Sequence, residues 1–92
     1  MIVRIMGEGQ YDVPDDALEG LNELDSALEA TLETGEETGF RTALTQLLDR
    51  VRSAGSRLPD DSLEASDAIL PDGEASIADV RDLLGEEGLI PG

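Results

Sequence analysis

The 92 residues of this chain make one small domain with a thin core, because so short a chain buries only about 60–65% of its unfolded surface. The formal charge of −16 comes from 22 acidic residues against six basic ones, which disfavours binding to nucleic-acid phosphates or to an anionic membrane surface. Cysteine and histidine are absent, which excludes disulfides, thiolate chemistry and a histidine general base.

Every basic residue is an arginine, and none is a lysine. Two interpretations explain so acidic a surface: the protein binds a basic partner, or it comes from an organism whose proteome is adapted to high salt. At molar salt a Debye length of about 3 Å screens the repulsion between carboxylates. The complete loss of lysine favours the second interpretation, so we expect a halophilic source. With no apolar run of about 18 residues and no signal-like segment, we also expect a cytoplasmic protein.

Two strands joined by a tight turn open the chain. Residues 1–6 are rich in β-branched side chains, and residues 10–13 alternate between polar and apolar. The side chains expected on the buried side are Val3, Ile5, Tyr11 and Val13. The other side of the first strand carries Ile2, Arg4 and Met6. Gln10 and Asp12 would face outward, and Gly7-Glu8-Gly9 suits the hairpin loop because glycine supplies a positive φ.

A first helix follows, and leucines mark its buried face. Asp15 or Asp16 begins it, because Asp16 and Glu19 have the spacing of a capping box. Asp25 lies at the edge of the leucine stripe, and Thr34-Gly35 interrupts it. The leucines recur at spacings of three and four, as one helix face requires: Leu18, Leu21, Leu24, Leu28 and Leu32.

A second helix begins at Glu36 and Glu37, where the helix dipole favours carboxylates. Gly55 follows its last apolar residue, in the position of a C-terminal glycine. Because only a few residues separate the two helices, we expect an antiparallel helical hairpin. The apolar stripe of the second helix is Phe40, Ala43, Leu44, Leu47, Leu48, Val51 and Ala54.

The last third of the chain is less regular. Residues 56–62 form a polar connector, Ala68-Ile69-Leu70 is a candidate third strand in an ambiguous stretch, and Pro71-Asp72-Gly73 is a turn. Ser76 and Asp79 predict a capping box for a short last helix that Gly85 ends. The apolar side of that helix is Ile77, Val80, Leu83 and Leu84. Leu89 and Ile90 are expected to dock on the core, since tails left in water are usually polar.

The predicted fold is therefore a small single α+β domain spanning residues 1–92. An N-terminal β-hairpin packs on an antiparallel helical hairpin, and a short third helix completes the core, in the order β-β-α-α-(β)-α.

None of the motifs for catalysis or cofactor binding is complete. Gly7 and Gly9 match two glycines of a dinucleotide fingerprint, but Asp12 stands in place of the third and a strand follows where a helix is needed. A P-loop needs a lysine, and a serine triad needs a histidine. The adjacent acids lack the spacing of a calcium loop and fit a solvated surface; they are Asp15-Asp16, Asp60-Asp61 and Glu86-Glu87. We predict no enzyme activity, catalytic residue, cofactor or metal site.

One positive patch stands out in the acidic chain. Arg50, Arg52 and Arg57 gather near the end of the second helix, opposed locally by Asp49. Cations there stabilise the helix dipole by about 0.3–1 kcal/mol, less in salt. Alternatively, the arginines form a docking site for an acidic partner helix, since guanidinium groups bind carboxylates through two hydrogen bonds. The sequence leaves both interpretations open.

Six segments carry a resemblance to a known family. They are MIVRIMGEGQYDV at the start, Leu21-Asn22-Glu23-Leu24-Asp25, Phe40-Arg41…Leu47-Leu48, Leu58-Pro59-Asp60, Ser66-Asp67…Leu70-Pro71 and Val80-Arg81…Leu84…Glu87-Gly88-Leu89-Ile90-Pro91-Gly92. Together they resemble the PspA-associated domain, PspAA, from Met1 to Gly92, as a stand-alone copy of haloarchaeal type. The resemblance implies a small intracellular protein that binds or regulates PspA, the coiled-coil, membrane-remodelling protein of the phage-shock envelope-stress response.

The partner-binding hypothesis joins the hairpin tip to the second helix. A groove between helices can grip a long helix, and Gln10 has no evident role within the hairpin. The residues expected to contact a PspA-type partner are Gly7, Glu8, Gly9, Gln10, Arg41, Arg50, Arg52 and Arg57. Any membrane contact would be peripheral, through that partner. The alternatives are a self-associating homodimer and, less favoured, a transcription regulator.

Overall fold

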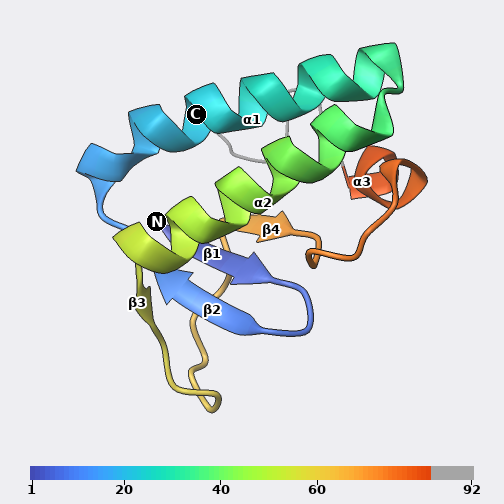
Figure 1. The fold of residues 1–92 in the computed structure, drawn as a ribbon. Helices are drawn as coiled ribbons and strands as arrows, with labels where there is room; N and C mark the ends of the chain where they lie inside the picture. Colours follow the sequence, from blue (N-terminus) through green and yellow to red (C-terminus); the bar gives the residue numbers. More distant parts are fainter. Residues whose placement is uncertain (84–92) are drawn as a thin grey trace.

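A four-stranded sheet and a helical hairpin form two packed layers, with a short helix at one end of the sheet (Figure 1). The computed structural model describes residues 1–83 of the chain. It confirms the predicted α+β class and the order β-β-α-α-β-α, and it adds one strand of two residues.

The sheet is built around the first strand of the chain. Its strands are β1 (Ile2–Ile5), β2 (Gly9–Asp12), β3 (Ser56–Arg57) and β4 (Ala68–Leu70), in the spatial order β3-β2-β1-β4. β2 pairs antiparallel with both β1 and β3, whereas β4 pairs parallel with β1. The sequence analysis predicted β4 but missed β3, which lies in the expected polar connector.

The β1–β2 hairpin forms as predicted, with one exception. Val3 lies opposite Tyr11, and Gly7 adopts a φ of 79° in the connecting loop. All four expected core residues of the hairpin are buried against the helices. Gln10, expected to face water, is instead 6% exposed. The prediction was wrong because the segment that follows β3 lies over the Gln10 side chain and bonds to it.

The helical layer consists of α1 (Leu18–Thr34) and α2 (Glu37–Ala54), which pack antiparallel. Gly35 ends α1 in the left-handed conformation, with a φ of 70°. Leucines of both predicted stripes fill the core, and Asp25, placed at the edge of the first stripe, is 3% exposed. Glu36 begins α2 by accepting a 2.9 Å hydrogen bond from the Gly39 amide.

The predicted capping box at the start of α1 does not form. A 3-10 turn, η1 (Asp15–Ala17), follows Pro14, and the Ala17 amide donates to the Pro14 carbonyl. Asp16 therefore lies inside this turn, and Ala17 occupies the N-cap position of α1 without a side-chain hydrogen bond. The tight turn after Pro14 displaced the cap that the Asp16–Glu19 spacing predicted.

Gly55 ends α2 where expected, but for a different physical reason. Its φ of −93° is ordinary extended backbone, so no left-handed conformation is involved. A Cβ at this position would instead lie 2.9 Å from the Val51 carbonyl oxygen and 3.1 Å from carbon atoms of Tyr11 and Val13. Glycine is required because α2 and β2 approach each other closely here.

The last described element is α3 (Ile77–Leu83). Its capping box forms as predicted: the Asp79 amide donates to the Ser76 hydroxyl at 3.1 Å, and the Ser76 amide donates to the Asp79 carboxylate at 3.1 Å. Val80 is fully buried. The predictions for Leu84, Gly85, Leu89 and Ile90 fall outside the described residues.

Candidate functional site

The hairpin tip and the end of α2 are joined through the carboxylate of Glu8. Arg52 donates three hydrogen bonds to it, the shortest at 2.7 Å from Nη2. The Tyr11 hydroxyl donates to the same carboxylate at 2.5 Å, and Arg57 donates to the Glu8 backbone carbonyl at 2.7 Å. Glu8, Arg52 and Arg57, three of the predicted site residues, therefore meet. Glu8 accepts hydrogen bonds from both arginines.

The electrostatics of this junction follow from those hydrogen bonds. Donation by Arg52, followed by donation from Tyr11, lowers the pKa of Glu8 from 4.5 to about 2. The Glu8 carboxylate raises the pKa of Tyr11 in turn. Arg52 also pairs with Asp49 at 3.0 Å, and Arg57 pairs with Asp60 at 3.5 Å. The two guanidinium groups thus already have carboxylate partners within the fold.

Gln10 faces the side of the sheet opposite the helices. Its amide nitrogen donates to the Glu64 carbonyl at 2.8 Å and to the Ser66 hydroxyl at 2.9 Å. Buried amides need such partners, and each unpaired polar atom would cost about 1–3 kcal/mol. Gln10 therefore fastens the segment between β3 and β4 to the sheet, which is the role that the sequence left unassigned.

The other predicted arginines lie elsewhere on α2. Arg41, near the start of the helix, donates to the Gly73 carbonyl at 3.1 Å, and its guanidinium lies 5.4 Å from the centre of the Phe40 ring. Arg50 is exposed and lies beside Gly20 of α1: a Cβ added to Gly20 would be 4.0 Å from the Arg50 Nε. The eight predicted residues do not form one continuous surface, and their contact with a partner stays a prediction.

The arginines divide into two groups by their contacts. Arg41, Arg52, Arg57 and Arg81 each donate to acceptors within residues 1–83; the last donates to the Leu32 carbonyl at 2.6 Å. Arg4 and Arg50 make no hydrogen bond or ion pair with any described residue. Among residues 1–83, these are the two guanidinium groups without an acceptor.

Arg4 lies on the face of the sheet that the helices leave open. We define the outer sheet face as the side chains of Ile2, Arg4, Met6 and Ile69. They alternate with buried residues along β1, the residue that follows it, and β4. Ile69 pairs in register with Arg4. Met6 is 48% exposed and Ile69 is 45% exposed. Both are among the large apolar residues that are exposed within residues 1–83. The alternation of β1 had indicated this face, but it was given no function in the sequence analysis.

A shallow hollow adjoins the outer sheet face at Met6. It has a volume of about 320 Å³, and its apolar lining residues are Met6, Pro71 and Ala75. Its remaining lining residues are three acids: Asp72, Asp79 and Asp82. None of the three forms an ion pair with a described residue.

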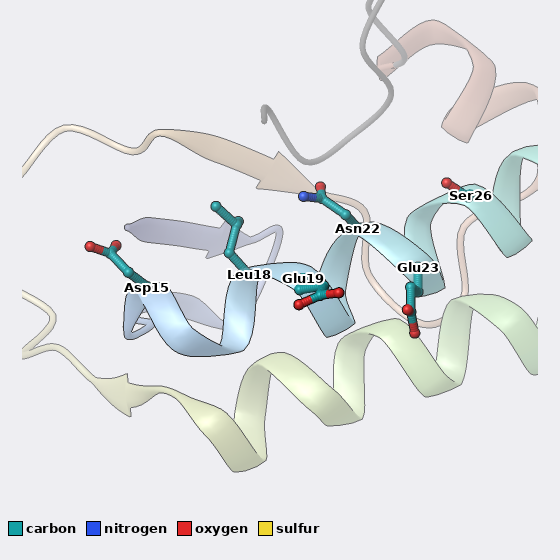
Figure 2. A pocket seen from close by; sticks show the side chains of 6 residues that line it. All are labelled: Asp15, Leu18, Glu19, Asn22, Glu23 and Ser26. Atoms are coloured by element: carbon teal, nitrogen blue, oxygen red, sulfur yellow. The ribbon is translucent and has the colours of Figure 1, made fainter.

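A second hollow, of about 520 Å³, runs along the surface of η1 and α1 (Figure 2). Its six lining residues all come from one helical stretch: Asp15, Leu18, Glu19, Asn22, Glu23 and Ser26. Three carboxylates on one helix surface, with no nucleophile and base brought together, do not make a catalytic arrangement. Within residues 1–83, no group of acidic side chains is arranged to hold a metal ion.

Comparison with known proteins identifies the family. The family model PspAA, described as PspA-Associated protein, matches residues 1–92, which is the whole chain. The chain belongs to the PspAA family. Neither the curated proteins nor the solved structures that were searched contain a match. Membership supports a PspA-linked role for this PspAA chain. None of the helices described in it combines the length and hydropathy of a membrane span.

Proposed function

We propose that this PspAA protein is a non-enzymatic adaptor that binds a PspA-type coiled-coil protein and acts in the phage-shock envelope-stress response. The observation that carries the proposal is the family match over all 92 residues.

The surface of the domain supports a binding role. Two half-exposed apolar side chains share one sheet face with Arg4, which makes no hydrogen bond or ion pair within residues 1–83, and an acidic hollow adjoins them. Apolar contacts flanked by charges are what a domain needs to hold an amphipathic helix. PspA-type proteins, as the family resemblance implies, consist of long helices of that kind.

The sequence-based version of the proposal places the contact at the hairpin tip with Arg50, Arg52 and Arg57. Arg52 and Arg57 already bond to Glu8, so their replacement would disturb the fold as well as any contact. Arg50 makes no bond with the described residues, so it is the residue through which that surface is to be tested.

The test uses the purified chain and the purified PspA-type protein from the same cell, mixed in molar potassium chloride and analysed by sedimentation. High salt keeps so acidic a chain from unfolding through its own charge. We expect a complex that an unrelated coiled coil of similar length does not form. If the two proteins sediment independently, the proposal is wrong. If the chain alone sediments as a dimer, the self-associating alternative takes its place.

A further inference from the structure

We propose that the outer sheet face, together with the acidic hollow beside Met6, is the surface on which a helix of the PspA-type partner docks. This inference rests on the proposed function and names its binding surface. The helix would place a carboxylate at Arg4, apolar side chains on Met6 and Ile69, and a lysine or arginine in the hollow.

The first step is that, within residues 1–83, Arg4, Met6 and Ile69 stay exposed on this face, although the segment between β3 and β4 covers Gln10 beside them. The helical hairpin packs on the other face of the sheet, where Val3, Ile5 and Leu70 are at most 1% exposed (Figure 1). An antiparallel sheet of a soluble protein commonly turns a polar side to water. Here Met6 and Ile69 stand on that side, each nearly half exposed. Apolar side chains that share an open sheet face favour contact with another molecule.

The second step is the charge of Arg4. The chain has 22 acidic residues, yet the Arg4 guanidinium contacts no described carboxylate. Its neighbour in register on β4 is the apolar Ile69, and its neighbour on β2 is the buried Gln10. A guanidinium among apolar side chains binds a carboxylate well, because it offers two parallel donors and is weakly hydrated. The partner should therefore bring an acidic side chain to this point.

The third step is the hollow at the other end of the face. Asp79 is used by the α3 cap and the Asp72 carboxylate accepts from the Glu74 amide, whereas Asp82 makes no bond with the described residues. Pro71 and Ala75, both buried, belong to the apolar lining of the same hollow. A lysine or arginine fits such a place, because its stem can cover apolar surface while its charge meets the carboxylates.

The spacing sets the pattern of side chains that the helix must carry. Arg4 and Met6 are two residues apart on an extended chain, which is about 6.6 Å. Residues four apart on a helix are about 6 Å apart along its axis. A matching helix therefore carries an acid, an apolar residue one turn away, and a basic residue one further turn away on the same face. A second copy of this chain is a poor occupant, because with six arginines, no lysine and 22 acidic residues it offers few basic side chains for the acidic hollow.

The experiment compares Arg4→Glu with Arg50→Glu in binding to the purified PspA-type protein by titration calorimetry. The two variants are matched, since both replace an exposed arginine that bonds to no described residue with the same acid. We expect Arg4→Glu to weaken binding by at least about tenfold, and by clearly more than Arg50→Glu, which tests the surface predicted from the sequence. Circular dichroism checks that each variant is folded, and Arg4→Gln repeats the test without a charge reversal.

Two further comparisons test the apolar contact and the hollow. Met6→Gln with Ile69→Thr should weaken binding at all salt concentrations. Asp82→Asn should weaken it, and more strongly at the lower end of the salt range in which circular dichroism shows the chain to be folded. The control Asp61→Asn should not, because Asp61 is an exposed acid away from the hollow.

Each outcome has a distinct meaning. If the wild-type chain binds but Arg4→Glu binds equally well, the surface is wrong and the adaptor function stands. If Arg50→Glu alone weakens binding, the surface is the one predicted from the sequence. If the wild-type chain does not bind, the proposed function fails and the surface assignment fails with it. If Arg4→Glu instead alters sedimentation of the chain alone, the occupant is a second copy.

Discussion

Replacement of Glu8 by glutamine should loosen the link between the hairpin tip and α2. Glu8→Gln keeps the shape of the side chain but removes the charge that Arg52 and the Tyr11 hydroxyl now bind. A shift in the pKa of Glu8 from 4.5 to about 2 corresponds to roughly 3.4 kcal/mol of interaction with the charged form. That figure is a ceiling, because Glu8 and Arg52 are 28% and 37% exposed and salt screens the pair. We expect a loss of about 1–2 kcal/mol in the free energy of unfolding.

The pH dependence of this loss has a definite sign. The folded pKa of Glu8 lies below its ordinary value, so the ionised carboxylate stabilises the folded state. The stabilisation should be complete above about pH 4.5 and should disappear as the pH falls toward 2. Protonation of the other acids changes the stability of the wild-type chain and of Glu8→Gln alike. The informative quantity is therefore the difference between their free energies of unfolding.

The assay is urea unfolding at fixed molar salt across that pH range. Glu23→Gln serves as the matched control, because it removes the same charge from an exposed position on α1; we expect it to change stability by less than about 0.5 kcal/mol. A double-mutant cycle with Arg52→Gln should return most of the Glu8 effect as coupling energy. A difference between wild type and Glu8→Gln that is the same at pH 6 and pH 2.5 would refute the reasoning.

Three other substitutions test separate features. Gly55→Ala should destabilise the fold by about 1–3 kcal/mol, because its Cβ would crowd the Val51 carbonyl and Tyr11, whereas Gly73→Ala, with only a 3.8 Å neighbour, should be mild; urea unfolding compares them. Gln10→Leu should cost about 1–3 kcal/mol and raise hydrogen exchange in residues 64–66, since it leaves the Glu64 carbonyl unpaired; unchanged exchange would contradict that role. Ser76→Ala should cost about 1 kcal/mol of thermal stability by removing the cap of α3, and no change in melting would mean that the cap is energetically silent.

Local patterns were enough to predict most of the elements. Leu21 and Leu28 lie on one face of α1 because helix spacing puts them there, and both are fully buried. Val3 and Ile5 follow the alternation of a strand in the same way. The cap at Ser76 needs only residues three apart, so its spacing identified it correctly.

One error is local, because the turn after Pro14 displaced the cap predicted at Asp16. The other errors concern contacts between residues far apart in the chain. Gln10 is buried by residues more than 50 positions away, and no pattern within the hairpin reports that cover. Arg52 reaches Glu8 across 44 positions, so the sequence showed a cluster of arginines without showing that Glu8 satisfies one of them. β3 has only two residues, which is too short to show a period. The outer sheet face also depends on a distant contact, because it forms only when β4 pairs with β1.

The parallel pairing of β1 with β4 also sets an order of events during synthesis. β1 and β2 can pair as soon as residue 12 is made, and the helical hairpin can follow from residues 18–54. The other edge of β1 must wait for residues 68–70, more than 60 positions later. Closing that long loop is a slow step, since non-local pairing is costly in chain entropy. Until then an apolar strand in the middle of the future sheet has an open edge. Until β4 is made, β1 is therefore the strand of the growing sheet that is most open to pairing with a chaperone or with another chain.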